Sequence, residues 1–399
     1  MTSSSVPRRL WSDASPSALA AGFVAVLVGF TSSVAIVFQA AAALGATPAQ
    51  LASWMWALGL GMGLCSLVPS WWLRKPVMVA WSTPGAAVLA AGAAAGGFTL
   101  AEATGAFLFA GALMLLAGAT GAFERLMDRI PMALAAALLA GVLARFGLQA
   151  FDAASAEPVL VIAMLVAYLL GRRWAPRYAV ILVLGVGLAL CVAQGRLHLE
   201  RVDAAFVVPE FVAPEWRWAA LVSLGIPLFL VTMASQNLPG VAAIRAAGYT
   251  LPISRLITMT GAATLLLAPF GAFALNLSAI TAAIAMGREA HEDPDRRYVA
   301  AMACGAIYVV IGLFGGAVAG LLLAFPKAFV AAIAGLALLG TIGGSLAAAL
   351  HDESRREAAL ITFLVTLSGV TLGGIGSAFW GVVAGALALL AARAFRRPG

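Results

Sequence analysis

The sequence has little charge for its length. Asp, Glu, Lys and Arg make up 10% of the 399 residues, hydrophobic residues make up 63%, and the mean hydropathy is +1.00. Charged residues account for about 25% of an average soluble domain, so the composition excludes a soluble fold. Apolar runs of about 18 residues or more, the length that spans a bilayer as a helix, recur along the chain. The composition therefore predicts an all-α polytopic membrane protein.

Cysteine and histidine are also scarce, with three of each. The cysteines lie far apart inside apolar runs, so neither a disulfide framework nor a metal site is expected. The histidines fall in predicted loops, which argues against a membrane-buried histidine proton relay. The sequence also has no nucleophile–base pair and no cofactor fingerprint. We therefore expect a protein that is not an enzyme and that needs neither a cofactor nor a metal.

No Asp or Glu lies deep within an apolar run, and basic residues outnumber acidic ones by 24 to 17. The Lys and Arg residues stand in short stretches between the runs, where positive charge sets the orientation of a membrane protein. This placement favours topology over nucleic-acid binding as the role of the net charge of +7, so no nucleic-acid partner is expected.

The apolar runs divide the chain into fourteen predicted segments. The first run is too long for a cleavable signal peptide and counts as a span. The longest polar interruption, 195–218, separates seven segments from seven, and an odd number in each half requires the halves to be inserted in opposite directions. We therefore predict an inverted repeat. The segments are 17–44, 49–72, 76–95, 101–123, 130–150, 157–172, 177–195, 217–244, 252–270, 271–288, 298–324, 327–350, 357–372 and 374–394.

The distribution of charge tests this count. With the N-terminus inside, nineteen of the 24 Lys and Arg residues fall in cytoplasmic loops, four fall in outer loops, and both termini are cytoplasmic. The remaining cation is Arg145, near the outer end of the fifth segment. Two roles are open for it: its side chain reaches to the membrane interface, or it has a function within the membrane.

Two segments, the third and the tenth, are broken in matching positions of the two halves. The first contains Trp81-Ser82-Thr83-Pro84-Gly85 and the second contains Asn276-Leu277-Ser278. In each, a short extended stretch leads into a half-length helix with a polar start, since Ser and Asn are good N-caps and Pro suits the first turn. Such paired breaks are the best sequence indication of a transporter's substrate site.

Polar residues also occur in the first and eighth segments, which occupy equivalent positions in the two halves. The first carries Thr31 and Gln39, and the eighth carries Gln236 and Asn237 just before Pro239-Gly240. An amide in hydrocarbon is costly unless it is paired or faces water, so these groups pair between helices or line a site. We predict one substrate-binding site that joins them with the residues of the broken segments, namely Trp81, Ser82, Thr83, Pro84, Asn276 and Ser278.

The predicted site has amides, hydroxyls and two helix N-termini but no carboxylate. The unpaired N–H groups of each helix start stabilise an anion by about 0.3–2 kcal/mol. A bulky aromatic carboxylate fits such a site if rings wall it. The aromatic residues near the breaks that could form this wall are Trp81, Phe30, Phe38, Phe270 and Phe273.

The stretch Ala80-Trp81-Ser82-Thr83-Pro84-Gly85-Ala86-Ala87, together with Phe38-Gln39-Ala40-Ala41, resembles the BenE family of bacterial benzoate:proton symporters. The resemblance extends over nearly the whole chain. It implies the seven-plus-seven inverted-repeat fold shared with nucleobase and sulfate-type carriers, an elevator motion and a homodimer formed through the scaffold. The domains that it implies are a core of 1–128 and 201–324 and a gate or scaffold of 129–200 and 325–399.

The resemblance also bears on the substrate. Asn276 and Ser278 resemble the Asn-x-Gly opening of the tenth half-helix in nucleobase carriers, with Ser in place of Gly. Those carriers place a Glu on the eighth helix where this chain has Ser235 or Gln236, which argues against a nucleobase.

Import of benzoate or a similar aromatic carboxylate with a proton, through the bacterial inner membrane, is the leading hypothesis. A nucleobase carrier, an inorganic-anion carrier and a passive anion channel remain alternatives. Because no buried titratable side chain is available, the proton would travel on the substrate carboxyl or on an acid at a helix end.

Overall fold

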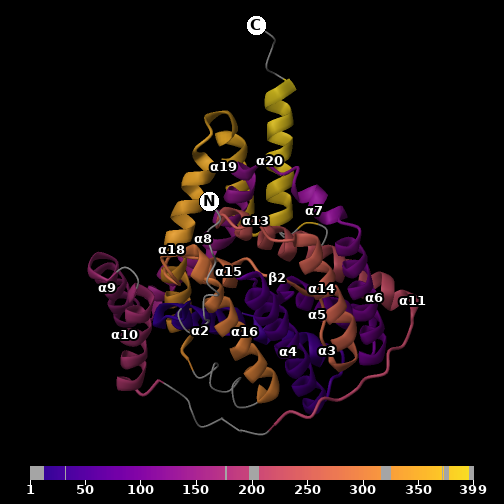
Figure 1. Cartoon of the computed structure of the whole chain (residues 1–399). Coiled ribbons are helices and arrows are strands. Elements are labelled where there is room, and N and C mark those ends of the chain that lie inside the picture. Colours follow the sequence, from indigo (N-terminus) through magenta and orange to yellow (C-terminus); the bar gives the residue numbers. More distant parts are fainter. Residues whose placement is uncertain are drawn as a thin grey trace, which may run out of the picture.

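The computed structural model describes residues 13–31, 33–175, 178–196, 206–315, 325–370, 372 and 377–394. The described chain is mainly helical, with two strands of three residues each (Figure 1). Apolar runs form helices here because a backbone in hydrocarbon has to satisfy its own N–H and C=O groups. The expected helical membrane protein is therefore what the chain forms.

The elements before residue 197 begin with a helix that is broken in two. In order, they are α2 (Pro16–Thr31), α3 (Val34–Ala43), α4 (Pro48–Leu73), β1 (Val79–Trp81), α5 (Thr83–Gly96), α6 (Leu100–Ala119), α7 (Ala122–Met127), α8 (Met132–Ala156), α9 (Pro158–Trp174) and α10 (Ala179–Ala193).

The elements after residue 205 include two turns of π-helix. In order, they are α11 (Trp218–Ala220), η3 (Leu221–Gly225), α12 (Ile226–Thr232), η4 (Met233–Asn237), α13 (Leu238–Ala246), α14 (Ile253–Leu267), η5 (Ala268–Phe270), β2 (Leu275–Leu277), α15 (Ile280–Ala285), η6 (Pro294–Arg296), α16 (Tyr298–Leu313), α18 (Lys327–Leu350), η7 (Glu353–Arg355), α19 (Arg356–Ser368) and α20 (Ser377–Ala394).

Seven of the described helices are each long and apolar enough to cross a bilayer. Pro16–Thr31 and Ile36–Ala43, which meet at an angle of 40°, make an eighth span when they are counted together. The fourteen-segment prediction also counts shorter helices and the two strand–helix units, so it stays a prediction. The ends of the eleventh segment and the start of the fourteenth fall partly outside the described residues.

Two predicted segments differ in length from the helices found. The fifth was expected to end at 150, but α8 continues to Ala156 because Asp152 and its small neighbours extend the helix instead of ending it. The tenth was expected to be a half-helix, and α15 is only six residues long. Both differences change how the site is built.

The helices pack in two sets. In one set, α8 lies along α18 and α19, α19 along α20, and α9 along α10. In the other, α4 lies along α16, α6 along α14, and α3 along α5. Figure 1 shows the first set along the left side and at the top, and the second in the centre and at the right. Contacts of α13 with α8 and of α2 with α18 join the sets.

The two strands pair antiparallel at the centre of the molecule, so the two broken segments meet as the sequence predicts. Val79 lies opposite Leu277, Ala80 opposite Asn276, and Trp81 opposite Leu275. Neighbouring helices satisfy the outer edges of this small sheet. Their hydroxyl and amide oxygens accept hydrogen bonds from strand N–H groups, namely Ser66 from Val79 at 2.9 Å, Thr264 from Leu275 at 3.1 Å and Asn237 from Leu277 at 2.9 Å.

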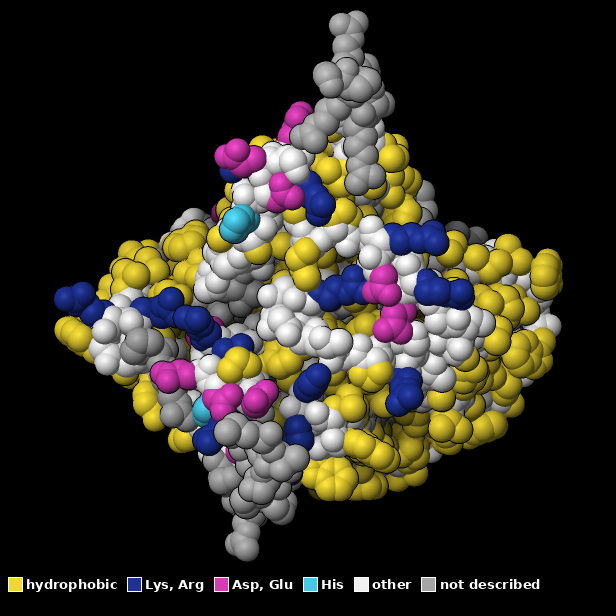
Figure 2. All heavy atoms as spheres, turned by 45° about the horizontal axis from the view of Figure 1, so that its top comes forward, with side chains coloured by type: hydrophobic (Ala, Val, Ile, Leu, Met, Phe, Trp, Pro, Cys, Tyr) yellow, Lys and Arg dark blue, Asp and Glu magenta, His cyan; other side chains and the backbone are white. Residues whose placement is uncertain are grey.

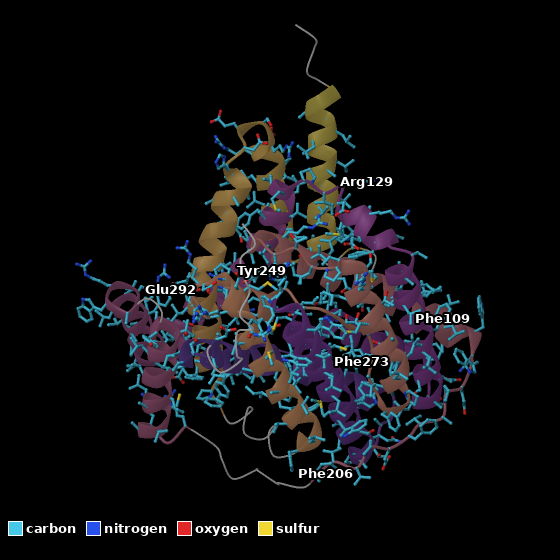
Figure 3. All side chains as sticks on the ribbon, in the orientation of Figure 1. Phe109, Arg129, Phe206, Tyr249, Phe273 and Glu292 are labelled. Atoms are coloured by element: carbon cyan, nitrogen blue, oxygen red, sulfur yellow. The ribbon has the colours of Figure 1, made fainter. Side chains whose placement is uncertain are left out.

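An extended strap, residues 206–217, crosses the lower end of the molecule, where Phe206 is labelled in Figure 3. Its backbone N–H groups donate hydrogen bonds to the ends of four helices and their adjoining turns. The acceptors are Ser53 Oγ for Glu210, the Pro269 carbonyl for Val212, the Ala101 carbonyl for Glu215 and the Leu313 carbonyl for Val207. The strap thereby ties α4, α6, α14 and α16 together at one end.

The opposite end of the molecule carries much of the charge. Figure 2, which brings the top of Figure 1 forward, shows Lys and Arg side chains spread across this face with Asp and Glu among them. Hydrophobic side chains cover the flanks on both sides. This arrangement is the one expected for a protein whose flanks face lipid.

Candidate functional site

A cavity of about 450 Å³ lies where the strand–helix units face α8, α19 and α20. Five of the ten residues predicted to bind substrate line it: Trp81, Thr83, Pro84, Gln236 and Ser278. These residues come from three segments far apart in the sequence, and the pairing of β1 with β2 brings two of those segments together.

The first strand–helix unit is a regular helix start. Ser82 is the N-cap of α5, and its Oγ accepts a hydrogen bond from the Gly85 N–H at 3.1 Å, while Pro84 occupies the first turn. This local geometry confirms the capping expected from the sequence. Ser82 itself is buried behind the cavity wall, where its Oγ also accepts a hydrogen bond from the Thr232 hydroxyl at 2.9 Å.

The second unit is built differently. The Ser278 Oγ accepts hydrogen bonds from the Thr281 hydroxyl at 2.7 Å and from the Thr281 N–H at 3.4 Å. Asn276 does not cap the helix: its amide N–H donates to the Ala274 carbonyl at 3.0 Å. Ala274 has a φ of 45°, which is strained for a residue with a Cβ. The Asn276 Oδ1 is buried and has no hydrogen-bond partner among the described residues.

The eighth segment contains a π-turn, η4 (Met233–Asn237), just before Pro239. Pro239 lacks an N–H and its ring clashes with the carbonyl four residues earlier, so the turn before it widens instead of continuing as α-helix. Ser235 and Gln236 lie in this wide turn, and both line the cavity.

Four other predicted residues lie away from the cavity wall, in addition to Ser82. The Thr31 hydroxyl donates to the Leu27 carbonyl of its own helix at 2.6 Å, and Gln39 is exposed on α3. Asn237 is fully buried and supports β2 through Leu277. Asn276 lies in β2, opposite Ala80. The structure therefore places Asn276 in the small sheet and Asn237 beside it, in η4.

The aromatic wall differs in part from the one expected. Trp81 lines the cavity, its indole N–H donates to the Ser33 Oγ at 2.9 Å, and Phe30 packs behind it with ring centroids 5.6 Å apart. Phe38, Phe270 and Phe273 are not among the lining residues. Phe146 and Tyr308 are, and they were missed because each lies within an uninterrupted apolar helix that gives no local signal.

Arg145 also lines this cavity. The expectation that it lies near the outer end of its segment is wrong, because α8 runs from Met132 to Ala156. At a rise of 1.5 Å per residue, Arg145 is about 16 Å from one end of α8 and about 20 Å from the other. It belongs to one face of the helix, with Val142, Phe146 and Gln149, that faces the cavity.

The charge of the cavity is therefore positive. Arg145 is the one ionised side chain among its lining residues, and none of them is Asp or Glu. A cation near the middle of a span costs about 2.5–3.5 kcal/mol on insertion scales, so such residues face cavities or partners and mark functional sites. Together with the N-terminal N–H groups of α5, this charge favours an anion.

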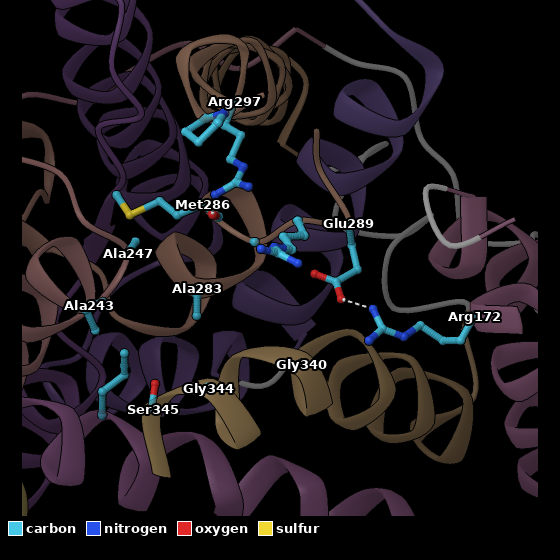
Figure 4. Close-up of a pocket in the computed structure, with 15 residues that line it drawn as sticks. Arg172, Ala243, Ala247, Ala283, Met286, Glu289, Arg297, Gly340, Gly344 and Ser345 are labelled. Carbon is cyan, nitrogen blue, oxygen red and sulfur yellow. Dashed lines mark hydrogen bonds and ion pairs between the residues drawn. The ribbon is translucent and has the colours of Figure 1, made fainter. Parts of the chain in front are cut away.

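A second cavity, of about 550 Å³, lies between the two sets of helices next to the end of α15 (Figure 4). Glu289, which is buried, points toward Arg172 of α9, and its Oε1 accepts a hydrogen bond from Arg172 Nη1 at 3.2 Å. Arg297 holds the wall by donating to the Met286 carbonyl at 2.8 Å and to the His291 carbonyl at 2.7 Å.

The fold and the central cavity fit a membrane transporter with a candidate site at paired breaks in apolar segments. The model of the BenE family, described as "Benzoate membrane transport protein", matches residues 12–390. The chain belongs to this family, which confirms the resemblance noted from the Trp-Ser-Thr-Pro-Gly motif. Its members are transporters and not enzymes.

Two curated relatives agree with this assignment, and one solved structure shares the fold. The chain is 51% identical over 370 residues to "Inner membrane protein YdcO" of Escherichia coli, covering 93% of this chain and 94% of the relative. It is 39% identical over 381 residues to "Benzoate membrane transport protein" of Acinetobacter baylyi, covering 96% of each. The structure of SLC26A9 matches with a TM-score of 0.52 at 11% identity, covering 95% of this chain and 65% of that one, and shows a shared fold.

Proposed function

We propose that this protein is a secondary active transporter that imports benzoate or a similar aromatic carboxylate together with protons across the bacterial inner membrane. One observation carries the proposal: the central cavity joins aromatic side chains to a positively charged, acid-free polar lining. A volume of about 450 Å³ lies within the range of roughly 300–1,000 Å³ of small-molecule sites. The relative described as a benzoate transport protein supports the substrate class.

The lining suggests how the substrate lies. Its ring packs against Trp81, Phe146 and Tyr308, and its polar end meets the hydroxyls of Thr83 and Ser278. Gln236 adds an amide from the π-turn. Ser82, Asn237 and Asn276 act from behind the wall by holding a helix start and the strand pair, and not by touching the substrate.

Two alternatives fit the lining less well, and a third differs in whether it can accumulate substrate. The eighth helix presents Ser235 and Gln236 where a nucleobase carrier of this fold would present a Glu. A small inorganic anion has no apolar ring that could pack against the three aromatic side chains of the wall. A passive anion channel would conduct down a gradient only and would not accumulate substrate.

The finer architecture is also part of the proposal. Fourteen segments form a seven-plus-seven inverted repeat, with 1–128 and 201–324 as the core and 129–200 and 325–399 as the gate or scaffold. The two sets of packed helices support this division. Both termini lie in the cytoplasm, and two copies form a homodimer through the scaffold. The core then moves against the scaffold as an elevator.

Uptake into proteoliposomes tests the function. The purified full-length protein is reconstituted, an inward proton gradient is imposed, and labelled benzoate is measured inside, with uracil and sulfate as competitors. We expect accumulation above equilibrium that collapses with a protonophore and resists both competitors. Equilibration without accumulation would indicate a channel, and competition by uracil would indicate a nucleobase carrier.

A further inference from the structure

We propose that the guanidinium group of Arg145 binds the carboxylate of the substrate from the α8 side of the central cavity. This inference rests on the proposed function and names the residue that selects an anion at that site. It starts from the position of Arg145, near the middle of α8 and on the helix face that lines the cavity. This guanidinium stands far from both ends of its helix, and its exposed side chain lines the cavity.

The second step is that the hydrogen-bond donors of Arg145 are available to a substrate. Among the described residues it makes no hydrogen bond or ion pair, and no acidic side chain lines the cavity with it. A guanidinium carries five N–H donors in a planar fork, which matches the two oxygens of a carboxylate. Lys offers only a point charge on a flexible stem, so the two residues are not equivalent at such a site.

The third step is that the fold leaves space for the guanidinium beside the end of α19. A Cβ added to Gly369, at the C-terminal end of α19, would lie 2.7 Å from both terminal nitrogens of Arg145. Gly369 has a φ of 71° and is the C-cap of α19, so the absence of a side chain there serves both the turn and the space for the guanidinium. The carbonyl end of α19 favours a cation beside it.

With these positions, two opposite walls of the central cavity contribute to recognition of the substrate. The helix starts and Gln236 offer neutral groups from one wall, Arg145 offers the charge from the other, and the aromatic side chains of Trp81 and Phe146 flank the space. Discrimination between benzoate and a neutral molecule of the same shape then depends on Arg145 more than on the helix starts.

The test compares benzoate with benzamide, which has the same shape and no charge. The half-saturation of benzoate uptake and the competition by benzamide are measured for the full-length protein, Arg145→Gln and Arg145→Lys. Arg129→Gln, at an exposed position outside the cavity, is the matched control. We expect Arg145→Gln to raise the benzoate half-saturation by roughly ten- to hundredfold and to leave benzamide competition unchanged. Arg145→Lys should give a smaller increase, and the control none.

Half-saturation within twofold of the unaltered protein in both variants would overturn the inference and leave the proposed function standing. An equal loss for benzoate and benzamide would overturn it too, by showing a structural role. If the Gln variant does not elute as a folded protein, Arg145→Lys decides by the same criteria. If the unaltered protein neither binds nor transports benzoate, the proposed function fails and the inference fails with it.

Discussion

The two strand–helix units look alike in sequence but differ in how their polar groups are satisfied. In the first, Ser82 caps a helix of fourteen residues and its hydroxyl has partners on both sides. In the second, the helix has six residues, Ala274 is strained, and the Asn276 Oδ1 is buried without a partner among the described residues. The capping hydroxyl of the first unit therefore has its hydrogen-bond partners within the described structure, whereas the Asn276 Oδ1 of the second unit can still accept a hydrogen bond.

The ends of the two units differ as well. After α5, Glu102 of α6 accepts a hydrogen bond from Arg217 of the strap, at 3.0 Å and within the same set of helices. After α15, Glu289 pairs with Arg172 of α9, which belongs to the other set. If the two sets move relative to each other, the second pair has to break and the first does not. We infer that the second unit is the one coupled to motion.

Among changes to the two strand–helix units, replacing Asn276 should have the largest effect on transport. Asn276→Ala removes an unused acceptor and one hydrogen bond to a strained residue, so we expect at least a tenfold loss of benzoate uptake. The cost in stability should be only about 1 kcal/mol, because a single hydrogen bond is lost. Uptake in proteoliposomes and thermal unfolding in detergent measure the two effects. Normal uptake would show that the spare acceptor has no function.

Removing the capping hydroxyl from each unit should have effects of different kinds. Ser82→Ala removes an N-cap behind the wall and should lower stability by about 1 kcal/mol, with half-saturation nearly unchanged. Ser278→Ala removes a hydroxyl from the cavity lining and should raise half-saturation about three- to tenfold with less effect on stability. The pair is measured in one set of uptake and melting experiments. Equal behaviour of the two variants would remove the distinction between the units.

Breaking the ion pairs at the two ends should have the smallest effects. Arg172 is 43% exposed and Arg217 is 53% exposed, so each pair contributes about 1 kcal/mol or less. Arg172→Gln should change the maximal rate of uptake by about two- to fivefold, because the pair crosses between the sets. Arg217→Gln is the matched control and should leave the rate unchanged. A similar change in both variants would refute the assignment of motion to the second unit.

Much of the fold was predictable because its signals are local. The breaks at Pro84 and Pro239, and the hydroxyls at Ser82 and Ser278, determine helix starts or wide turns through groups within a few residues. The pairing of the two units was expected from the predicted equivalence of the halves, and the strand pairing agrees with it. These features located one wall of the cavity and Gln236 on it.

The opposite wall was not predictable in the same way. Phe146 and Tyr308 lie in regular helices, and only packing decides which face of each helix meets the cavity. The depth of Arg145 was misjudged because the fifth segment was expected to end at 150, whereas α8 continues to Ala156. Gln39 shows the reverse error, since a polar residue in an apolar run was expected at the site and the structure leaves it exposed on α3.

The strap links the two halves non-covalently, in addition to the covalent chain. Residues 206–217 belong by sequence to the later half, yet Glu210 and Glu215 donate backbone hydrogen bonds to Ser53 and Ala101 of the earlier half. If the gene were divided between the codons for 196 and 206, the second fragment would therefore carry the strap, whose backbone N–H groups bind acceptors in the first fragment. We therefore expect the two fragments, produced together, to associate.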